Sequence, residues 1–303
     1  MKTRLFTTAW VFAALSMVFL VGCAIDQVAQ VGTAVGQSTG VVSKDQAQSI
    51  NRSAEAVSKA AEDFTPEQEH FIGRAVGATL LAKTKPYNDS QANNYINLIG
   101  QSLALASDRP ETFGGYRFQI LDSTEINAFA APGGFIFVTR GMLSLCKNED
   151  EIAAVLAHEI AHVALGHGIL AIDKSRKMEA LKILAVEGTK TFGGKELADL
   201  TTAFESSIGD ITSTLVNKGY SRAFEREADA AAVKILTRIG YNPAALAAML
   251  REMEKKLKPG GPDFARTHPS PASRIADLPA SFGPQPPAPA ARRDRFEKAL
   301  RYI

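Results

Sequence analysis

One hexapeptide, Ala157 to His162 (AHEIAH), constrains this chain more than any other stretch. Residues four apart on a helix share a face, so His158 and His162 would point at one place, as two zinc ligands do at about 2.0–2.1 Å from the metal. Glu159 lies beside that face and is placed to take a proton from an attacking water. The segment from Glu149 to His167 is largely apolar and helix-prone, and buried polar side chains need partners. We therefore interpret the motif as a metal site rather than as a surface helix that carries two histidines by accident.

A zinc site that hydrolyses its substrate needs a third protein ligand and one open position. The segment 220–229 is predicted to be helical and carries Glu225 and Asp229 four residues apart, so both can face the site. The economical assignment makes Glu225 the third ligand, with Asp229 accepting a hydrogen bond from the far nitrogen of a ligating histidine. Glu227 would point elsewhere on this helix and is interpreted as a solvated surface charge. Without the upstream motif, the same segment would be interpreted as a charged helix face with Arg–Glu pairs.

Several further motifs stand in order around these two helices, over most of residues 65–280. They are Glu69 with Ile72-Gly73, Tyr95 with Ile99-Gly100, the run from Asn127 to Gly134, the HExxH motif, Ser221 to Asp229, and Thr267-His268-Pro269. In this combination the chain resembles the M48 family of zinc metallopeptidases, which includes bacterial periplasmic and outer-membrane peptidases and the mitochondrial Oma1-type proteases. The resemblance implies a zincin-like peptidase fold. It also implies that His158, His162 and Glu225 bind one zinc ion per chain and that Glu159 is the catalytic base.

Two comparisons narrow the resemblance. Metzincins need HExxHxxGxxH, whereas Leu165 and Gly168 stand at the glycine and third-histidine positions here, and His167 is one residue out of register. Some M48 relatives carry tetratricopeptide repeats after the peptidase domain, but the period of about 34 residues that marks such repeats does not appear in this chain. We therefore expect the glutamate-ligand class, without such repeats.

The first 22 residues are typical of a bacterial lipoprotein signal peptide. Lys2 and Arg4 make a basic start, an apolar stretch follows, and Leu20-Val21-Gly22-Cys23 fits a lipobox. Cys23 would become the lipidated first residue and anchor the chain to a membrane. The alternative, an uncleaved anchor, has an apolar core shorter than the roughly 20 residues of a spanning helix. Ala24 stands where an inner-membrane retention signal would place aspartate, which favours the periplasmic side of an outer membrane.

Charge and cysteine usage narrow the function classes. Removal of residues 1–22 takes away Lys2 and Arg4, so the formal net charge changes from +2 to 0. No basic stripe remains, and we expect no nucleic-acid partner. With Cys23 lipidated, Cys146 has no cysteine to pair with in the mature chain, and we interpret it as a small core residue rather than as a nucleophile.

The expected domain organisation follows from composition and capping residues. Residues 23–63 contain no aromatic residue and are interpreted as a flexible tether. The peptidase domain is expected over 64–282, and its first helix has Thr65 as N-cap, Pro66 at the first helical position and Gln68 in a capping box. Helices are predicted near 66–84 and 90–106, and later from Asn242-Pro243 to about Leu257. Residues 171–217 are interpreted as a helical insertion. Residues 283–303 are interpreted as a Pro/Ala-rich tail whose short helix docks on the domain or lies on a headgroup surface.

The β part is predicted from alternation and from one turn. A strand is expected over 116–121, and two more strands flank Pro132-Gly133-Gly134. The predicted fold is therefore α+β, mostly helical, with one small antiparallel sheet beside the HExxH helix. The resemblance places the second strand along the cleft, where an exposed strand edge pairs with an extended substrate backbone. The candidates for substrate contact are Asn127, Ala128, Phe129 and Ala130. The alternative is an ordinary hairpin whose glycines only make the turn.

A loop that follows the glycine-rich break at 259–262 carries His268, which the family pattern places at the active site. Two functional roles stay open for it. His268 stabilises the oxyanion of the tetrahedral intermediate, or it fills the open coordination position and keeps the enzyme latent. A loop histidine bonded to the backbone is the third interpretation. Arg274 is a candidate partner for a carboxylate near the cleft or for the substrate.

The sequence thus predicts a zinc metalloendopeptidase in which Glu159 takes the proton of the attacking water and delivers it to the leaving amine. Compartment and family indicate misfolded or stalled cell-envelope proteins as substrates, in envelope quality control. The main alternative is a chaperone-like or scaffolding factor for envelope and outer-membrane proteins with a latent zinc site. A zinc enzyme that acts on peptidoglycan is a further alternative, although no motif resembles a cell-wall-binding module.

Overall fold

A computed structural model describes residues 64–172, 208–213, 215, 219–257, 268–283 and 287–303. The predicted signal peptide with Cys23, the tether, most of the predicted insertion and Thr267 lie outside these residues. The compact unit that carries the site runs from Thr65 to Ile303. In the described part of the chain, no helix is long and apolar enough to cross a membrane.

Two helices open this unit and begin where the sequence predicts. Helix α3 spans Pro66–Lys83. The Gln68 N–H donates to the Thr65 Oγ1 at 3.2 Å, and the Thr65 N–H donates to the Gln68 Oε1 at 3.0 Å, which is the predicted capping box. Helix α4 spans Ser90–Leu105 and is capped by Asp89. Both predicted helices are therefore confirmed.

A three-stranded sheet follows, with strands β1 (Arg117–Leu121), β2 (Ala128–Ala131) and β3 (Phe135–Thr139). Strand β3 lies in the middle, antiparallel to β2 and parallel to β1. The prediction of an antiparallel sheet is confirmed for the β2–β3 hairpin and wrong for β1. The reason is that residues 122–127 carry the chain past the central position to the far edge, so the hairpin turn returns β3 beside β1 in the same direction.

The hairpin turn is a short 3-10 turn, η1 (Pro132–Gly134), in which Gly133 has a φ of 72°. Its position is held by Glu69 of α3. The Gly133 N–H donates to Glu69 Oε1 at 3.0 Å, and Arg109 donates to both oxygens of Glu69 at 3.1 and 2.7 Å. Helix α3 comes close to the turn because Gly73 has no side chain, since a Cβ there would lie 1.8 Å from the carbonyl oxygen that opens the turn. Two of the motif residues, Glu69 and Gly73, thus position the hairpin.

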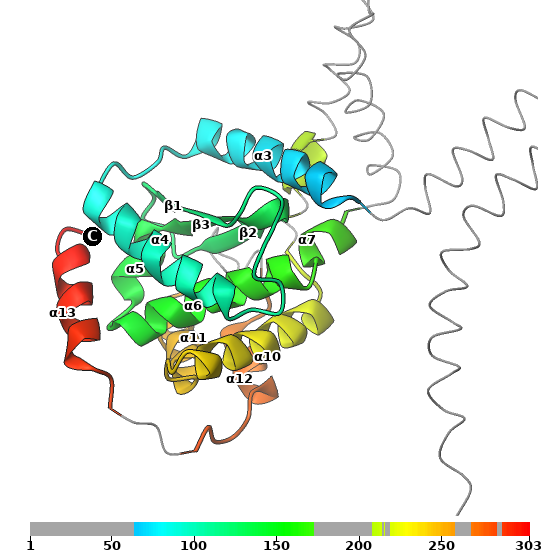
Figure 1. Ribbon diagram of the computed structural model, residues 1–303. Coiled ribbons are helices and arrows are strands. Elements are labelled where there is room, and N and C mark those ends of the chain that lie inside the picture. The colour runs from blue at the N-terminus through cyan, green and yellow to red at the C-terminus, as the bar shows by residue number, and fades with distance from the viewer. Residues whose placement is uncertain (1–63, 173–207, 214, 216–218, 258–267, 284–286) are drawn as a thin grey trace, which may run out of the picture. The chain divides into compact units, whose positions relative to one another are not determined.

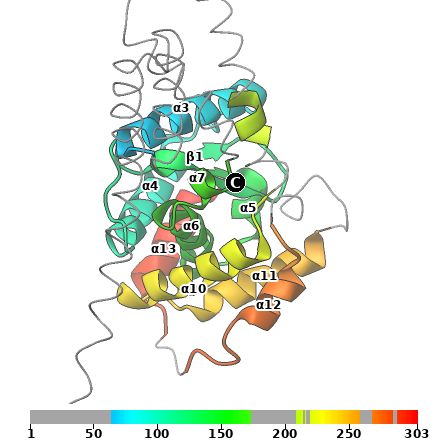
Figure 2. The same cartoon turned by 90° about the vertical axis from the view of Figure 1, so that its right-hand side faces the viewer.

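The helix that carries the HExxH motif lies in the middle of the domain. Helix α6 (Glu149–Ala164) packs against the sheet, and α3 covers the other face of the sheet (Figure 1). Helices α10 (Arg222–Arg238) and α11 (Ala244–Lys256) pack on α6 from the side away from the sheet, and Figure 2 shows the same order of layers after a turn of 90°. All residues of α6 from Glu149 to Val163 are buried, as the apolar flanks predict.

Helix α6 is shorter than the predicted helix, which extended to His167. It ends at Ala164, and Gly166 adopts a φ of 70°, so the chain changes direction before α7 (His167–Leu170) begins. A position with a positive φ favours glycine, and an α-helix ends at such a position. The change of direction returns the first residue of α7 toward the HExxH motif.

Short elements complete the domain. They are α5 (Arg140–Leu145), α12 (Pro271–Asp277) and α13 (Ala290–Ala299). Cys146 directly follows α5 and is buried, which confirms its prediction as a core residue. Burial raises the pKa of its thiol well above the ordinary value. Helix α12 begins after Ser270, whose hydroxyl accepts a hydrogen bond from the Ser273 N–H.

The C-terminal helix α13 docks on the domain, which is one of the two locations predicted for the tail. Arg295 donates to both carboxylate oxygens of Glu149, at 2.5 and 3.1 Å. The Glu149 side chain is fully buried and also accepts hydrogen bonds from the hydroxyls of Tyr95 and Tyr241, at 3.1 and 2.9 Å. The tail therefore binds the first turn of α6, the helix that carries the HExxH motif.

Candidate metal centre

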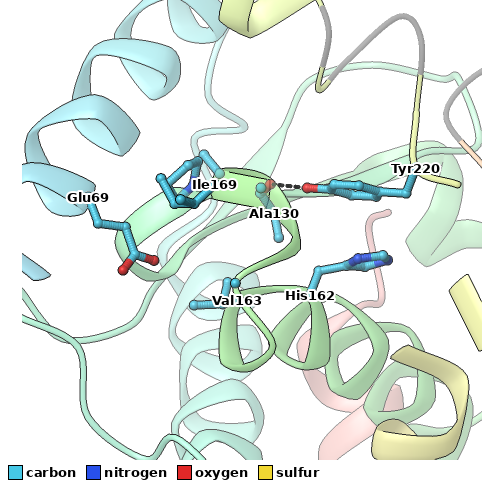
Figure 3. Close-up of a pocket in the computed structure, with 10 residues that line it drawn as sticks. Glu69, Ala130, His162, Val163, Ile169 and Tyr220 are labelled. Carbon is cyan, nitrogen blue, oxygen red and sulfur yellow. Dashed lines mark hydrogen bonds between the residues drawn. The ribbon is translucent and has the colours of Figure 1, made fainter. Parts of the chain in front are cut away.

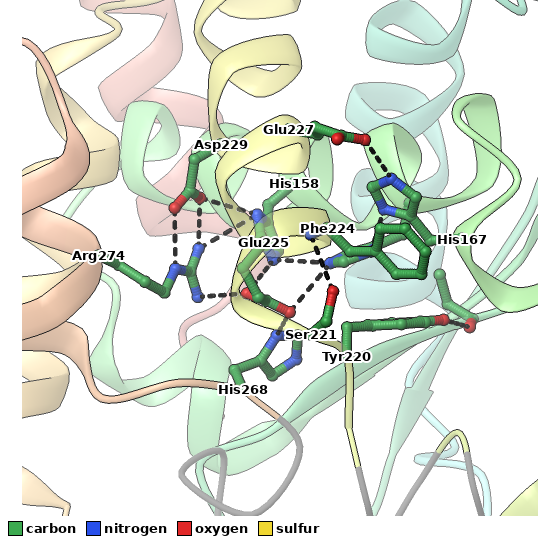
Figure 4. A network of polar contacts seen from close by, with 12 residues as sticks. His158, His167, Tyr220, Ser221, Phe224, Glu225, Glu227, Asp229, His268 and Arg274 are labelled. Atoms are coloured by element: carbon green, nitrogen blue, oxygen red, sulfur yellow. Dashed lines mark hydrogen bonds and ion pairs between the residues drawn. The ribbon is translucent and has the colours of Figure 1, made fainter. Parts of the chain in front are cut away.

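Four side chains from three segments form a buried donor cluster. The nitrogen or oxygen donors of His158, His162, Glu225 and His268 all lie within 4.8 Å of one another (Figure 4). The Nε2 atoms of His158 and His162 are 3.1 Å apart, and the two oxygens of Glu225 lie 3.5 and 3.4 Å from them. His268 Nδ1 lies 2.8 Å from Glu225 Oε1. The three residues predicted as zinc ligands are thus brought together, with His268 as a fourth donor beside them.

Helix periodicity and the packing of α10 on α6 create this cluster. His158 and His162 lie one turn apart on α6, as their spacing predicts. Ser221 caps α10, since its hydroxyl accepts a hydrogen bond from the Phe224 N–H at 3.3 Å. This cap starts the helix so that Glu225 stands in its first turn, where α10 packs along α6. His268 is supplied by the loop just before α12.

The far nitrogen of His158 contacts Asp229 and Arg274. Asp229 Oδ1 lies 3.0 Å and Arg274 Nη2 lies 3.1 Å from His158 Nδ1. Arg274 also donates to both oxygens of Asp229, at 3.0 and 2.5 Å, and its Nη1 lies 3.5 Å from Glu225 Oε2. When the Nδ1 hydrogen of His158 is donated to Asp229, its Nε2 lone pair is directed at the donor cluster.

The buried charges of the centre do not cancel. Glu159, Glu225 and Asp229 carry one negative charge each when ionised, Arg274 carries one positive charge, and the sum is −2 with neutral histidines. Burial acts to raise the pKa of Glu225, but His268 and the hydrogen bonds from the three histidines outweigh it and hold that pKa well below the ordinary value. Burial also opposes ionisation of Asp229, where Arg274 and His158 lower the pKa. The centre is therefore an anionic site suited to a divalent cation.

The two histidines of the motif differ in their ordinary protonation. Burial lowers the pKa of His162 to about 3, which keeps its imidazole neutral, the form that binds metals. For His158, burial and Arg274 act to lower the pKa, but the hydrogen bonds with Asp229 and Glu225 outweigh them and raise it to about 9. A cation at the donor cluster would replace the Nε2 proton of His158.

Glu159 is buried beside the cluster, and among the described residues neither of its carboxylate oxygens has a hydrogen-bond partner. Burial raises its pKa, although His268 and His158 oppose this effect. A buried carboxylate without a partner is costly and calls for an explanation such as a catalytic role or an ion or water. Its position next to His158 on the chain makes it the candidate proton carrier of the centre.

The donor set fits zinc. A tetrahedral zinc ion at about 2.0–2.1 Å from its ligands separates two of them by about 3.3 Å, close to the 3.1 Å between the Nε2 atoms of His158 and His162. Two imidazoles with one glutamate are a known catalytic ligand set for zinc. The formal charge of −2 with neutral histidines agrees with a divalent cation at this place, and the Glu159 carboxylate, which the described residues leave without a hydrogen-bond partner, agrees with a water beside it.

The four candidates for substrate contact divide into two pairs. Asn127 is bonded to β3, since its carbonyl accepts from the Thr139 N–H at 3.0 Å and its N–H donates to Thr139 Oγ1 at 3.1 Å. Backbone groups alternate in direction along an antiparallel strand, so Phe129 faces β3 as Asn127 does, whereas Ala128 and Ala130 face the outer edge. Strand β2 is at the edge of the sheet, but all four of its residues are buried, so the prediction that this edge is exposed is wrong.

Tyr220, which the sequence analysis did not assign, covers the edge at Ala130. Its hydroxyl donates to the Ala130 carbonyl at 3.4 Å, and its ring stacks on His162 with the centroids 4.1 Å apart and the planes at 17°. Burial raises the pKa of this hydroxyl, so it stays protonated. A small pocket lies next to this contact and is lined by residues of α3, β2, η1, α6 and α7 (Figure 3). Those labelled in the figure are Glu69, Ala130, His162, Val163, Ile169 and Tyr220.

His167 contacts a residue of the donor cluster, and Glu227 contacts His167. His167 Nδ1 lies 3.0 Å from His162 Nδ1, and His167 Nε2 lies 3.2 Å from Glu227 Oε2. The side chain of Glu227 is 58% exposed, as predicted for a solvated charge, yet it contacts a buried histidine. The available sequence signal was the third histidine five residues after His162, but its position depends on the turn at Gly166.

Comparisons with known proteins agree with this geometry. The model of a family described as Peptidase family M48 matches residues 90–281. The putative beta-barrel assembly-enhancing protease of Vibrio cholerae is 28% identical over 221 residues, which are 71% of this chain and 44% of that protein. The beta-barrel assembly-enhancing protease of Escherichia coli strain K12 is 27% identical over 213 residues, which are 69% of this chain and 43% of that protein. The mitochondrial metalloendopeptidase OMA1 of Schizosaccharomyces pombe is 34% identical over 158 residues, 50% of this chain and 42% of that protein. The chain spans less than half the length of these relatives.

Proposed function

The chain belongs to peptidase family M48, and from this premise we propose that it is a zinc metalloendopeptidase of the cell envelope. Zinc is assigned to His158, His162 and Glu225, one ion per chain. The observation that carries the proposal is the anionic donor cluster with the buried Glu159 carboxylate beside it, which has no hydrogen-bond partner in the described part of the chain. The similar proteins are also named as proteases or endopeptidases.

The chain's own residues divide the work. A bound zinc ion would polarise the scissile carbonyl and make a nearby water more acidic. Glu159 accepts the proton of that water on its carboxylate and returns it to the leaving amine. Asp229 and Arg274 hold the His158 ring so that its Nε2 keeps facing the cluster. The substrate backbone would bond to Ala128 and Ala130 once Tyr220 has left the Ala130 carbonyl, while Asn127 and Phe129 hold the strand to β3.

The proposed substrates are misfolded or stalled proteins of the cell envelope. Support comes from the two similar proteins that are named as beta-barrel assembly-enhancing proteases. Lipidation at Cys23, attachment to the membrane through that lipid, and a position on the periplasmic side of an outer membrane belong to the same proposal. These rest on the lipoprotein-type start of the sequence.

The test measures zinc content and casein cleavage with the full chain in detergent. The parent is expected to hold one zinc ion and to cut casein. Glu159→Gln should keep the metal and lose cleavage, by a factor of at least about 10²–10⁴, because an amide cannot carry the proton. Glu254→Gln, a glutamate-to-glutamine change at an exposed position on α11, is the matched control and should cut like the parent. A parent without zinc under metal-replete conditions would overturn the site assignment.

A second candidate function follows from the closed state of the centre. His268 lies against Glu225 as a fourth donor, and Tyr220 occupies the Ala130 carbonyl, so both a coordination position and a strand-edge acceptor are taken by protein groups. The chain would then act as a chaperone-like or scaffolding factor for envelope and outer-membrane proteins, with a latent zinc site. Zinc in the parent without cleavage by the parent, by His268→Ala or by Tyr220→Phe would favour this function.

A further inference from the structure

His167, labelled in Figure 4, contacts Nδ1 of the His162 ring, whereas Nε2 of that ring faces the donor cluster. Its Nδ1 is 3.0 Å from His162 Nδ1, and its Nε2 is 3.2 Å from Glu227 Oε2. The His167 side chain is only 1% exposed and stacks on Phe224 with the centroids 4.4 Å apart and the planes at 9°. The three side chains His162, His167 and Glu227 therefore form a row that leads from the cluster to the surface of α10.

The positions of the hydrogens in this row follow from what each nitrogen faces. Two Nδ1 atoms at hydrogen-bond distance share one hydrogen, so one ring donates and the other accepts. His162 Nε2 faces Glu225 and His158 and must keep its lone pair to bind a cation, so the hydrogen of neutral His162 lies on Nδ1 and is donated to His167. His167 then carries its own hydrogen on Nε2, where Glu227 accepts it.

Helix α10 supplies a carboxylate for each of the two histidines of the motif. Asp229 contacts His158 Nδ1 directly at 3.0 Å. Glu227 reaches His162 Nδ1 through the His167 ring. Both carboxylates lie on α10, the helix that also supplies Glu225. Tyr220 stacks on His162 and limits tilting of that ring, but a ring held only by stacking can still turn within its own plane. The bond to His167 removes that freedom.

We propose that His167 and Glu227 are positioning residues for His162. They select the tautomer in which Nε2 carries a lone pair, and they fix the direction of this lone pair. They also make the imidazole a stronger electron-pair donor to a metal ion. The inference rests on the zinc site proposed above and extends it to a second carboxylate on α10. The competing view is that His167 only fills the space between α7 and α10, where its ring packs on Phe224.

Two substitutions of nearly the same shape separate these views. In His167→Asn, the amide oxygen occupies the place of Nδ1 and can accept the hydrogen of His162. In His167→Leu, a methyl group takes that place and cannot accept. A packing role predicts similar behaviour for both variants, whereas a positioning role predicts a difference between them.

The experiment is a titration of zinc against a chromophoric chelator, with the full chain in detergent, together with the Tm of the chelated protein. We expect His167→Leu to bind zinc about 10–100-fold more weakly than the parent. His167→Asn should recover most of that loss, and the two variants should have similar Tm values without zinc. His70→Leu, a change at a histidine outside the centre, is the control and should bind zinc like the parent.

Glu227 is tested in the same titration. Glu227→Ala should weaken zinc binding in the parent and have no further effect in the His167→Leu background, because the row is already interrupted there. Glu254→Ala is the matched control, an exposed glutamate on α11. Additive losses in the double variant would contradict a row that acts through His167.

The inference is overturned if His167→Leu and His167→Asn both bind zinc like the parent. It is also overturned if both lose the same affinity along with a lower Tm of the zinc-free protein, since that result describes packing. A parent that binds no zinc at all would instead overturn the zinc site itself, so the two failures are distinguishable.

Discussion

Asp229 Oδ1 lies 3.0 Å from His158 Nδ1, while the Nε2 of the same ring faces Glu225 at 3.5 Å. Arg274 donates hydrogen bonds to both oxygens of Asp229. One carboxylate between a guanidinium and an imidazole thus orients a ligand that the sequence places only on the correct face of α6. The affinity of the centre for zinc should therefore depend on this pair as well as on the ligands themselves.

We expect Asp229→Asn to bind zinc about 10–100-fold more weakly than the parent, because the neutral amide loses the charge that holds the His158 hydrogen and can turn its NH₂ group toward the ring. Competition with a chelator measures the affinity. The matched control is Asp277→Asn, which changes an aspartate that pairs with Arg222 at 3.2 Å, where the arginine is largely exposed. Equal affinities for the parent and Asp229→Asn would contradict the role given to this residue.

Replacement of His268 should open a coordination position at the centre and raise the rate of cleavage. His268 is a fourth buried donor at the cluster, and a zinc ion held by all four donors would have the closed coordination of a structural site, whereas catalysis needs one open position. We therefore expect His268→Ala to keep zinc and to cut casein several-fold faster than the parent, in a comparison of initial rates at equal zinc content. His70→Ala serves as the control outside the centre. Slower cleavage by His268→Ala would instead indicate that His268 stabilises the oxyanion.

Removal of zinc should lower the thermal stability. The donor cluster is buried and anionic, and a cation that binds only the folded state adds about 2.7 kcal/mol to the free energy of unfolding when free zinc is 100-fold above Kd. For a domain of this size that corresponds to about 5–10 °C in Tm. Calorimetry before and after chelation checks this, and restored zinc should restore the Tm. An unchanged Tm after complete loss of zinc would show that the ion does not bind at these buried groups.

The docking of α13 should contribute to the stability of the domain. Arg295 and Arg292 are paired with Glu149 and Asp150, and the Glu149 side chain is fully buried. Arg292→Ala combined with Arg295→Ala should therefore lower the free energy of unfolding by about 1–3 kcal/mol, because a buried carboxylate loses its charged donors. Denaturant unfolding of the zinc-bound chain measures the difference.

The control for α13 is Arg293→Ala on the same helix, where the side chain is 70% exposed. It should leave the unfolding midpoint unchanged. Adding Glu149→Gln to the double arginine variant should recover part of the lost stability, since a neutral amide has less need of a charged donor. No loss in the double arginine variant would mean that Tyr95 and Tyr241 satisfy Glu149 on their own.

The features that depend on local periodicity were predictable from the order of the residues. The spacing of His158, Glu159 and His162 sets their faces on one helix, and the spacing of Glu225 and Asp229 does the same on another, wherever those helices pack. The capping box at Thr65 was equally predictable, since all of its partners lie within one turn. Membership of a known family added the pairing of the two helices.

The relationships between helices and strands depend on packing and were not predictable from local patterns. Whether β1 runs parallel to β3 depends on which edge the chain reaches after residue 121, and alternation along a strand says nothing about that. The turn at Gly166 brings His167 onto His162, and the α6–α10 contact brings Glu227 onto His167. Tyr220 contacts the edge of β2, which the sequence pattern predicted to be exposed. Most of these contacts join residues far apart in the chain, and the one between His162 and His167 crosses a turn, so all of them form only when packing has fixed the positions of the helices and strands.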